Sequence, residues 1–323
     1  MKLKKTIIGM ALVSLFLLSL SAPFTLAKSG DMGVDEGQED ILITSDYITM
    51  KIVDKQPHFI WWNGNRSSAD EMYKVQFKSV QEFFGDDTVL DSIFELNGLS
   101  YNLVSSDWLI DISEDENHIT VTMTLNDLAN EADIQFIVNI YAEDEPIEGT
   151  DQVVEALTEV KFDIVVNNWI FSEDAKGLTF KVEVLEAQQR HRVRIRNGTA
   201  QEHGNATRNM VFESEENGNN KVAYFEWTTF ADVYNGSEKI DTIDVGTAFF
   251  EPPGDPQGPI DPNTGMIHFW LTYPNYGDSL TLVHDPSIGI NPDSFVSPLY
   301  FLPIIGGLVT TAIVVAVIRK RKQ

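Results

Sequence analysis

The stretch Ile119-Thr-Val-Thr-Met-Thr-Leu125 indicates the fold class of this chain. Four apolar side chains alternate with three threonines, so an extended backbone puts the apolar groups on one face and the hydroxyls on the other. Such one-sided strands are typical of antiparallel sheets, which have one face in the core and one in water. The stretch therefore predicts a strand of an antiparallel sheet.

The same alternation recurs on both sides of this stretch. It is found at residues 48–52, 73–77, 134–140, 160–166, 178–184, 267–273 and 280–282. Five Asn-Gly pairs occur along the chain, and Asn-Gly tolerates the positive φ angles of tight turns. No long segment outside the two chain ends has helical periodicity. We expect an all-β fold, a large antiparallel β-sandwich, because two stacked sheets can bury many one-sided strands.

The sandwich is expected to span residues 41–284. The acidic segment 144–151 contains proline and glycine, so it is either a loop within one sandwich or a linker between two smaller domains. Residues 267–284 are expected to form the last hairpin, with a turn at 275–278. Residues 28–40 are rich in glycine and acids, and a flexible N-terminal segment is expected there.

Both ends of the chain carry targeting signals. Residues 298–318 have no charge and are long enough to cross a bilayer as a helix, and the basic tail 319–323 follows. The positive-inside rule places this tail in the cytoplasm. Residues 1–27 have the pattern of a cleaved signal peptide, the alternative being an uncleaved anchor. We expect a single-pass protein of the cell membrane, with its N-terminus outside, its C-terminus cytoplasmic and residues 285–297 as a stalk.

The expected external part is strongly acidic. Of the 23 basic residues, three lie in the signal segment and four in the tail, whereas all 49 acidic residues lie between these ends. The external part therefore has 49 acidic and 16 basic residues, a net charge of −33. This charge argues against nucleic acids and anionic lipids as partners, because both require a positive surface. The chain has no cysteine, so burial must stabilise the fold without disulfides.

Two longer stretches of the chain are distinctive. One is Val160-Lys-Phe-Asp-Ile-Val-Val-Asn-Asn-Trp-Ile-Phe171, and the other runs from Leu271 to Ile290 and ends in Val283-His-Asp-Pro-Ser-Ile-Gly-Ile290. Both resemble segments of uncharacterised archaeal surface proteins that have a signal peptide, a β-rich ectodomain and a C-terminal membrane helix. The resemblance implies an archaeal envelope location, and it implies no activity, cofactor or catalytic residue.

Four Asn-x-Ser/Thr sequons predict N-glycosylation of the external part, as expected for a surface glycoprotein. Their acceptor residues are Asn65, Asn197, Asn205 and Asn235.

A concentrated basic stretch, Arg190-His-Arg-Val-Arg-Ile-Arg196, provides one candidate binding site. As a strand it puts Arg192, Arg194 and Arg196 on one face. These residues either pair with acids on neighbouring strands, or they form a docking stripe for a carboxylate-bearing glycan or an acidic envelope protein. The second interpretation rests on the two hydrogen bonds that a guanidinium group makes to a carboxylate.

Aromatic residues provide a second candidate site. Trp61, Trp62 and Trp270 supply either flat surfaces on which a sugar stacks or core packing at the ends of the sheets. Because side chains alternate along a strand, Trp61 and Trp62 must lie on opposite faces, and one of them is expected to be exposed.

A calcium site is the third candidate. Asp111, Ser113, Asp115 and Asn117 place oxygen atoms at alternate positions, and a loop with this spacing can curl around Ca²⁺. The EF-hand pattern fails, because Glu116 stands where glycine is needed. The alternative interpretation is a charged turn before the next strand.

Two further metal candidates depend on more distant residues. Asp255 and Asp261 lie in one proline-rich loop, and His268 and His284 would be cross-strand neighbours in the expected last hairpin.

The sequence contains neither Gly-x-Ser-x-Gly nor His-Glu-x-x-His, and no catalytic residue is predicted. We expect a membrane-anchored surface protein with a binding, adhesion or envelope-structural role. The alternative is a surface carbohydrate-active protein, lectin-like or a glycoside hydrolase. A concave aromatic cleft with two close acids would favour the enzyme, and flat faces would favour the structural role.

Overall fold

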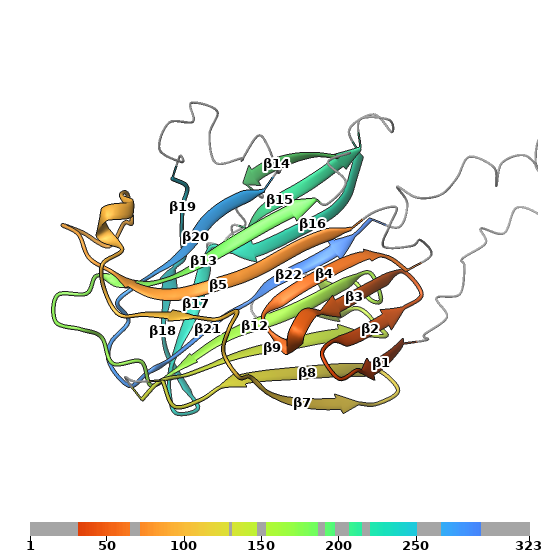
Figure 1. Cartoon of the computed structure of the whole chain (residues 1–323), viewed down its shortest axis with the longest axis horizontal. Coiled ribbons are helices and arrows are strands. Elements are labelled where there is room, and N and C mark those ends of the chain that lie inside the picture. Colours follow the sequence, from red (N-terminus) through yellow and green to blue (C-terminus); the bar gives the residue numbers. More distant parts are fainter. Residues whose placement is uncertain are drawn as a thin grey trace, which may run out of the picture.

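The computed structural model describes residues 32–64, 72–128, 131–146, 153–186, 191–197, 207–214, 220–250 and 266–291. In this part of the chain, strands β1 to β22 form two large antiparallel sheets and one short ribbon (Figure 1). The helical segments found here are two 3-10 turns, η1 (Val53–Lys55) and η2 (Ile93–Glu95). The prediction of an antiparallel all-β fold is therefore confirmed.

The expected signal peptide (1–27) and membrane helix (298–318) lie outside the described residues. Within the described ranges, no helix has the length and apolar character needed to cross a membrane.

Sheet A has nine strands in the order β1-β2-β3-β4-β5-β13-β20-β19, and β6 also pairs with β5. Its strands are β1 (Met32–Glu36), β2 (Ile41–Ser45), β3 (Ile48–Ile52), β4 (His58–Asn63), β5 (Tyr73–Phe83), β6 (Ser100–Asn102), β13 (Gly177–Glu186), β19 (Gly246–Ala248) and β20 (Ile267–Pro274).

Sheet B has eleven strands. Its main path is β14-β15-β16-β22-β12-β21-β17-β18, and β7 and β8 join it through β9, which pairs with β12. Its strands are β7 (Leu109–Glu114), β8 (His118–Leu125), β9 (Asp133–Tyr141), β12 (Glu159–Asn167), β14 (His191–Asn197), β15 (Thr207–Ser214), β16 (Asn220–Thr228), β17 (Phe230–Asn235), β18 (Glu238–Asp244), β21 (Thr281–His284) and β22 (Pro286–Ile290). The ribbon consists of β10 (Glu145–Pro146) and β11 (Val153–Val154).

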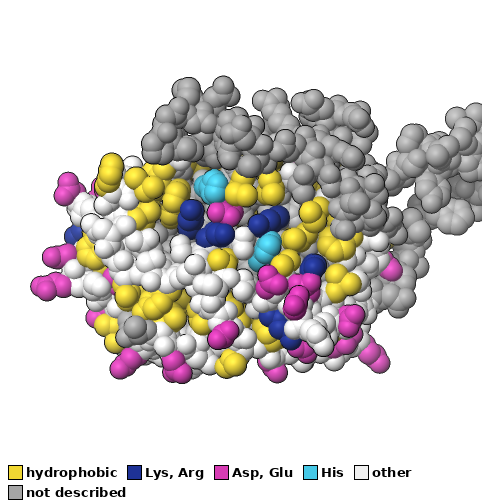
Figure 2. All heavy atoms as spheres, viewed as in Figure 1, with side chains coloured by type: hydrophobic (Ala, Val, Ile, Leu, Met, Phe, Trp, Pro, Cys, Tyr) yellow, Lys and Arg dark blue, Asp and Glu magenta, His cyan; other side chains and the backbone are white. Residues whose placement is uncertain are grey.

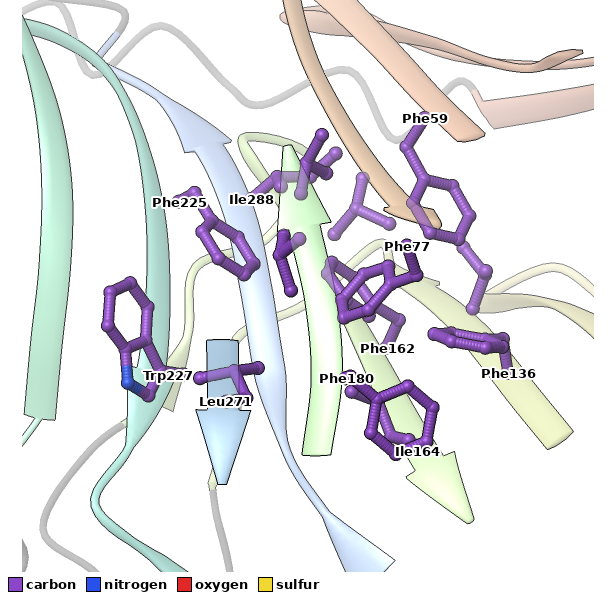
Figure 3. Close-up of a cluster of buried hydrophobic side chains, with 14 of the residues drawn as sticks. Phe59, Phe77, Phe136, Phe162, Ile164, Phe180, Phe225, Trp227, Leu271 and Ile288 are labelled. Carbon is purple, nitrogen blue, oxygen red and sulfur yellow. The ribbon is translucent and has the colours of Figure 1, made fainter. Parts of the chain in front are cut away.

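Phenylalanine rings fill the space between the two sheets (Figure 3). Phe59 of sheet A stacks on Phe162 of sheet B at a ring-centre distance of 5.1 Å, and Phe77 of sheet A lies 4.9 Å from Phe136 of sheet B. All four side chains are fully buried and belong to one continuous core. The one-sided strands read from the sequence thus turn their apolar faces toward each other, as in a β-sandwich.

Polar side chains also connect the two sheets through the core. The Trp61 indole N–H donates to the carbonyl oxygen of Gly289 at 3.2 Å. His284 lies between Tyr273 of sheet A and the carbonyl oxygen of Thr228, with its ring nitrogens at 2.8 and 2.9 Å from these partners. Burial lowers the pKa of His284 to about 4, so the imidazole is neutral at pH 7.

The segment 144–151 does not divide the fold into halves. Sheet A combines β1 to β6 with β13, β19 and β20, and sheet B likewise contains strands from before and after this segment. A cut at 144–151 would therefore separate strands that are hydrogen-bonded neighbours in both sheets.

Several expected boundaries are wrong. Residues 32–36, expected to be flexible, form β1, because Met32 and Val34 pack against the core. Residues 286–290, expected to belong to a stalk, form β22, in which Ile288 and Ile290 are buried. The sandwich therefore extends beyond 41–284 at both ends.

The expected last hairpin is also wrong. β20 belongs to sheet A and β21 to sheet B, so the turn at 275–278 crosses from one sheet to the other. His268 consequently lies on the outer face of sheet A, whereas His284 is buried, and the two histidines form no cross-strand pair.

Candidate functional site

Strand pairing in sheet B is interrupted at Asp285. β21 and β22 follow each other along the same edge of β12, with Asp285 between them. On their other edge, β21 pairs with β17 whereas β22 pairs with β16. Between these two pairings, the stretch from Trp227 to Asp232 has two residues more than the facing stretch from Val283 to Pro286, so the strand edge is irregular next to Asp285.

The register around Asp285 places two carboxylates opposite each other. Ile164 pairs with His284, and Lys161 pairs with Ser287, so the intervening Asp163 lies opposite Asp285. Like charges directly opposite each other destabilise an antiparallel pair. Residues that break such a rule of stability are expected at functional sites.

Lys161 holds this pair of carboxylates together on the outer face. Its ammonium nitrogen lies 3.0 Å from Oδ1 of Asp163 and 3.4 Å from Oδ2 of Asp285. The three side chains are 18–31% exposed, so they contact water at the bottom of a depression and not on an open surface.

Burial and like charge change the proton affinity of this cluster. The pKa of Asp163 is raised to about 6, first by burial and then by the Asp285 carboxylate, with Lys161 acting in the opposite direction. For Lys161, burial alone lowers the pKa, but the two aspartates outweigh it and the net shift is upward. The cluster therefore combines a permanently charged lysine with a carboxyl group that titrates near pH 6.

A cavity of about 700 Å³ lies over the cluster, between the β10–β11 ribbon and strands β17 and β18. Tyr141, Phe230 and Tyr234, all half-buried, form its aromatic wall. Asp232 and Lys239 also line the cavity and form an ion pair at 2.7 Å. The volume is within the range of small-molecule sites in proteins.

A second chamber of about 290 Å³ shares Val154, Lys161, Thr228 and Asp285 with the first. It is lined by three glutamates, Glu155, Glu159 and Glu226, and by Lys221 and Tyr224.

The glutamates make this second chamber acidic. Burial raises the pKa of Glu159, and the Glu226 and Glu155 carboxylates add to the shift, whereas a hydrogen bond from Ser287 opposes it. Asn209 donates to Oε2 of Glu226 at 2.9 Å. The two chambers together thus present more carboxylates than ammonium groups to a ligand.

The tryptophans predicted to bind sugars are not brought together. Trp61 is fully buried in the core, and Trp62 lies half-exposed on the opposite face of β4, as the alternation predicts. Trp270 is 8% exposed on the outer face of sheet A, where Phe83, Leu90 and Phe250 pack around it. Trp61 and Trp270 are therefore packing residues and offer no open stacking surface.

The predicted arginine stripe lies in β14, an edge strand of sheet B. Arg192, Arg194 and Arg196 pair in register with Glu213, Val211 and Asn209 of β15. The alternation of the three arginines along one strand is as predicted, and their side chains lie outside the described part of the structure.

The predicted calcium residues do not surround a common point. Asp111 lies in the extended strand β7, and a strand rises about 3.3 Å per residue, so Asp115 is far from it along the chain. Oδ1 of Asp115 instead accepts the backbone N–H groups of Asn117 and His118, at 2.8 and 2.9 Å. In the described ranges, no group of three or more His, Asp or Glu side chains could hold a metal ion. The loop with Asp255 and Asp261 lies outside these ranges.

The sequons fall in different parts of the chain. Asn235 is the exposed last residue of β17, directly before the turn in which Gly236 has a φ of 60°. Asn197 is the last residue of β14. Asn65 and Asn205 lie outside the described residues.

Sequence reasoning missed Lys161, Asp163 and Asp285. Lys161 and Asp163 stand at polar positions of an alternating strand, and Asp285 stands between two strands. Charged residues are common at such positions, so the sequence pattern did not single them out. The two stretches quoted for the archaeal resemblance contain these residues, and in the structure these stretches pair with each other along β12, β21 and β22. Comparison with known protein families and with curated proteins finds no match for this chain.

Proposed function

We propose that the chain is a membrane-anchored cell-surface glycoprotein whose sandwich binds a carbohydrate in the double chamber on the outer face of sheet B. The topology follows from the apolar segment 298–318, its basic tail and the signal pattern of residues 1–27. The archaeal envelope is the location that the sequence resemblance implies.

The observation that carries the binding function is the Lys161–Asp163–Asp285 cluster beneath an aromatic wall. Carboxylates accept hydrogen bonds from sugar hydroxyls, and the ammonium group of Lys161 donates them. Tyr141, Phe230 and Tyr234 add apolar contact area at the side of the cavity. Pockets of this kind, with aromatic walls and a few converging polar groups, are the usual form of small-molecule sites.

The charge of the chambers selects among carbohydrates. The larger cavity has Asp163, Asp232, Asp285 and Glu145 against two lysines, and the smaller adds three glutamates. An acidic sugar would meet like charges, which cost several kcal/mol when desolvated. We therefore expect neutral and amino sugars to bind and uronic acids to be rejected.

Glycoside hydrolysis is the second candidate, because a pair of close acids, Asp163 and Asp285, and aromatic residues occur in one cavity. Its geometry is unfavourable. Retaining enzymes need carboxyl groups about 5–5.5 Å apart and inverting enzymes about 6.5–9.5 Å, so that the sugar or a water fits between them. Asp163 and Asp285 share Lys161, whose ammonium nitrogen lies 3.0 and 3.4 Å from one oxygen of each, so the lysine occupies the position between them that the sugar or a water needs. Binding without cleavage is therefore the function that the cluster favours.

The test is a binding panel on the full chain in lipid nanodiscs. Neutral, amino and uronic oligosaccharides are offered in parallel, and each bound sugar is recovered and checked for cleavage. The proposal expects retention of neutral or amino sugars, recovered intact. Retention of uronic oligosaccharides alone, or of no oligosaccharide at all, would contradict the proposal. Recovery of shortened products would favour the hydrolase.

A further inference from the structure

The loop between β5 and β6, residues 84–99, presents apolar side chains to water. Val89, Ile93 and Phe94 are 62%, 51% and 87% exposed, and they lie within six residues of each other. Single exposed apolar residues are common on protein surfaces, whereas a cluster of large ones marks an interaction site. We call this loop the knob.

The knob is held in a fixed conformation. The backbone N–H of Phe84 donates to the carbonyl oxygen of Glu95 at 2.9 Å, and Oε2 of Glu95 accepts the N–H of Asp91 at 3.1 Å. Ser92 caps η2 by accepting the N–H of Phe94 at 3.2 Å. Leu90 anchors the loop on Phe83 and Trp270 of sheet A. The exposed side chains are thus presented by an ordered loop, which lowers the entropy cost of docking.

The charge around these side chains is negative. Asp86, Asp87 and Asp91 are exposed on the same loop, and it contains no lysine or arginine. An anionic lipid surface would repel this loop. The partner that it fits is a protein surface with apolar groups among positive charges.

Such a surface lies on the outer face of sheet A of the same chain. Figure 2 shows lysine and histidine side chains gathered in the middle of this face. Lys74 and Lys78 come from β5 and Lys181 from β13, and the neighbouring side chain between them is Glu183. We call these three lysines and their neighbours the lysine face.

The lysines of this face exceed its acids. Glu183 already has two partners, the ammonium nitrogen of Lys78 at 3.6 Å and Nδ1 of His268 at 3.4 Å. Burial lowers the pKa of Lys74, Glu183 acts in the opposite direction, and the like charge of Lys78 lowers it further, so the net shift is downward.

Apolar side chains border the same lysines. Lys74 lies between Ile60 of β4 and Leu185 of β13 in the cross-strand register, and both are half-buried. The lysine face thus has the two properties that complement the knob. Its positive charge complements the aspartates of the knob, and its accessible apolar area complements the exposed apolar side chains.

We propose that the knob of one molecule docks on the lysine face of a second copy. Apolar contact of Ile93 and Phe94 with Ile60 and Leu185 would be surrounded by pairs between the knob aspartates and the face lysines. Because the knob and the face are different surfaces, the contact is heterologous, and each molecule keeps one free knob and one free face. Copies can therefore add to one another in open chains. This contact uses sheet A, so it is independent of the carbohydrate site on sheet B.

The test is sedimentation of the full chain, one copy per lipid nanodisc, over a range of concentration and salt. We expect self-association that weakens as salt screens the charges. Phe94→Ser and the double variant Lys78→Gln/Lys181→Gln should each weaken it at least tenfold. Ile240→Ser, which removes a 49% exposed apolar side chain from β18, and Lys55→Gln on η1 are the matched controls and should associate as the wild type does.

Mixing the two variants separates this contact from other partners. The lysine variant keeps its knob and the Phe94→Ser variant keeps its face, so a mixture should form one-to-one pairs and nothing larger. Self-association that survives either variant, a mixture that forms no pairs, or a wild-type chain that stays monomeric up to about 1 mM would each overturn the proposal.

Discussion

Asp163 is a residue at which the structure departs from what stability alone would select. It is a carboxylate placed opposite another carboxylate, on a strand whose inner face is fully packed. Asparagine at this position would keep the shape and remove the repulsion. The cost of keeping aspartate here is therefore a measurable quantity.

The sign of this cost follows from the pKa of Asp163. An aspartate has an ordinary pKa of 3.8, and in the fold that of Asp163 is about 6, so the folded state binds more protons between these values. The stability contributed by this group is complete below pH 4 and is lost as the pH rises through about 6. Relative to the wild type, Asp163→Asn should thus gain up to about 3 kcal/mol between pH 4 and pH 7.

Urea unfolding of both proteins at the two pH values measures this gain. Asp107→Asn, the same change at an exposed loop residue, should show no such difference. If Asp163→Asn changed the unfolding free energy equally at both pH values, the pKa of Asp163 would not be raised in the folded state.

Core phenylalanines offer a second residue-level prediction. Phe162 is fully buried and contacts Phe59 and Phe225, and Phe136 is fully buried against Phe77 and Trp108. Replacing either by alanine should cost about 3–5 kcal/mol of unfolding free energy, because the change leaves a cavity. A loss below about 1 kcal/mol for both, measured by chemical unfolding, would mean that these side chains do not face the core.

At the scale of elements, the strands with strict alternation are the ones that the sequence predicts. β8 and β12 are examples, and their inner faces are those read from the apolar positions. The alternation could not predict that the turn at 275–278 crosses from sheet A to sheet B. A turn between two alternating strands has the same sequence pattern whether the strands belong to one sheet or to two. β22 was missed because its apolar positions are two isoleucines only, and its other residues are serine, glycine and proline.

The β7–β8 turn distinguishes a structural from a calcium-binding role for Asp115. Its carboxylate accepts two backbone N–H groups, so Asp115→Ala should cost about 1–3 kcal/mol. Because Asp111 is held away in β7, millimolar Ca²⁺ at matched ionic strength should leave the melting temperature of the wild type unchanged. A calcium-dependent rise that disappears in Asp115→Ala would restore the metal site.

For the whole molecule, the composition and the alternation of apolar and polar residues were sufficient to predict the fold class. They were not sufficient to predict the site. The alternating runs predicted a β-fold, and the absence of cysteine predicted that it has no disulfides. The site depends on which strand lies beside β12, and Asp163 and Asp285 are 122 positions apart in the sequence. Such a pairing is fixed by the packing of the complete sheets, so no local pattern contains it.

Truncation tests the molecule as a whole. A chain ending at residue 297 should be secreted and folded, because it keeps both sheets and lacks the apolar segment 298–318. A chain ending at residue 284 lacks β22, which lies between β12 and β16, and it should fail to fold. Protease resistance of the secreted material measures both outcomes. A stable chain ending at 284, or a chain ending at 297 that stays with the membrane, would contradict the architecture or the topology.

The most direct test of the carbohydrate site is a calorimetric titration of the full chain with the tightest-binding neutral or amino oligosaccharide of the panel. We expect one site per molecule with a dissociation constant between about 1 μM and 1 mM. Asp163→Asn and Asp285→Asn should each weaken it at least tenfold, whereas Asp107→Asn should bind as the wild type does. Unchanged affinity in both cluster variants would contradict the assignment of the site.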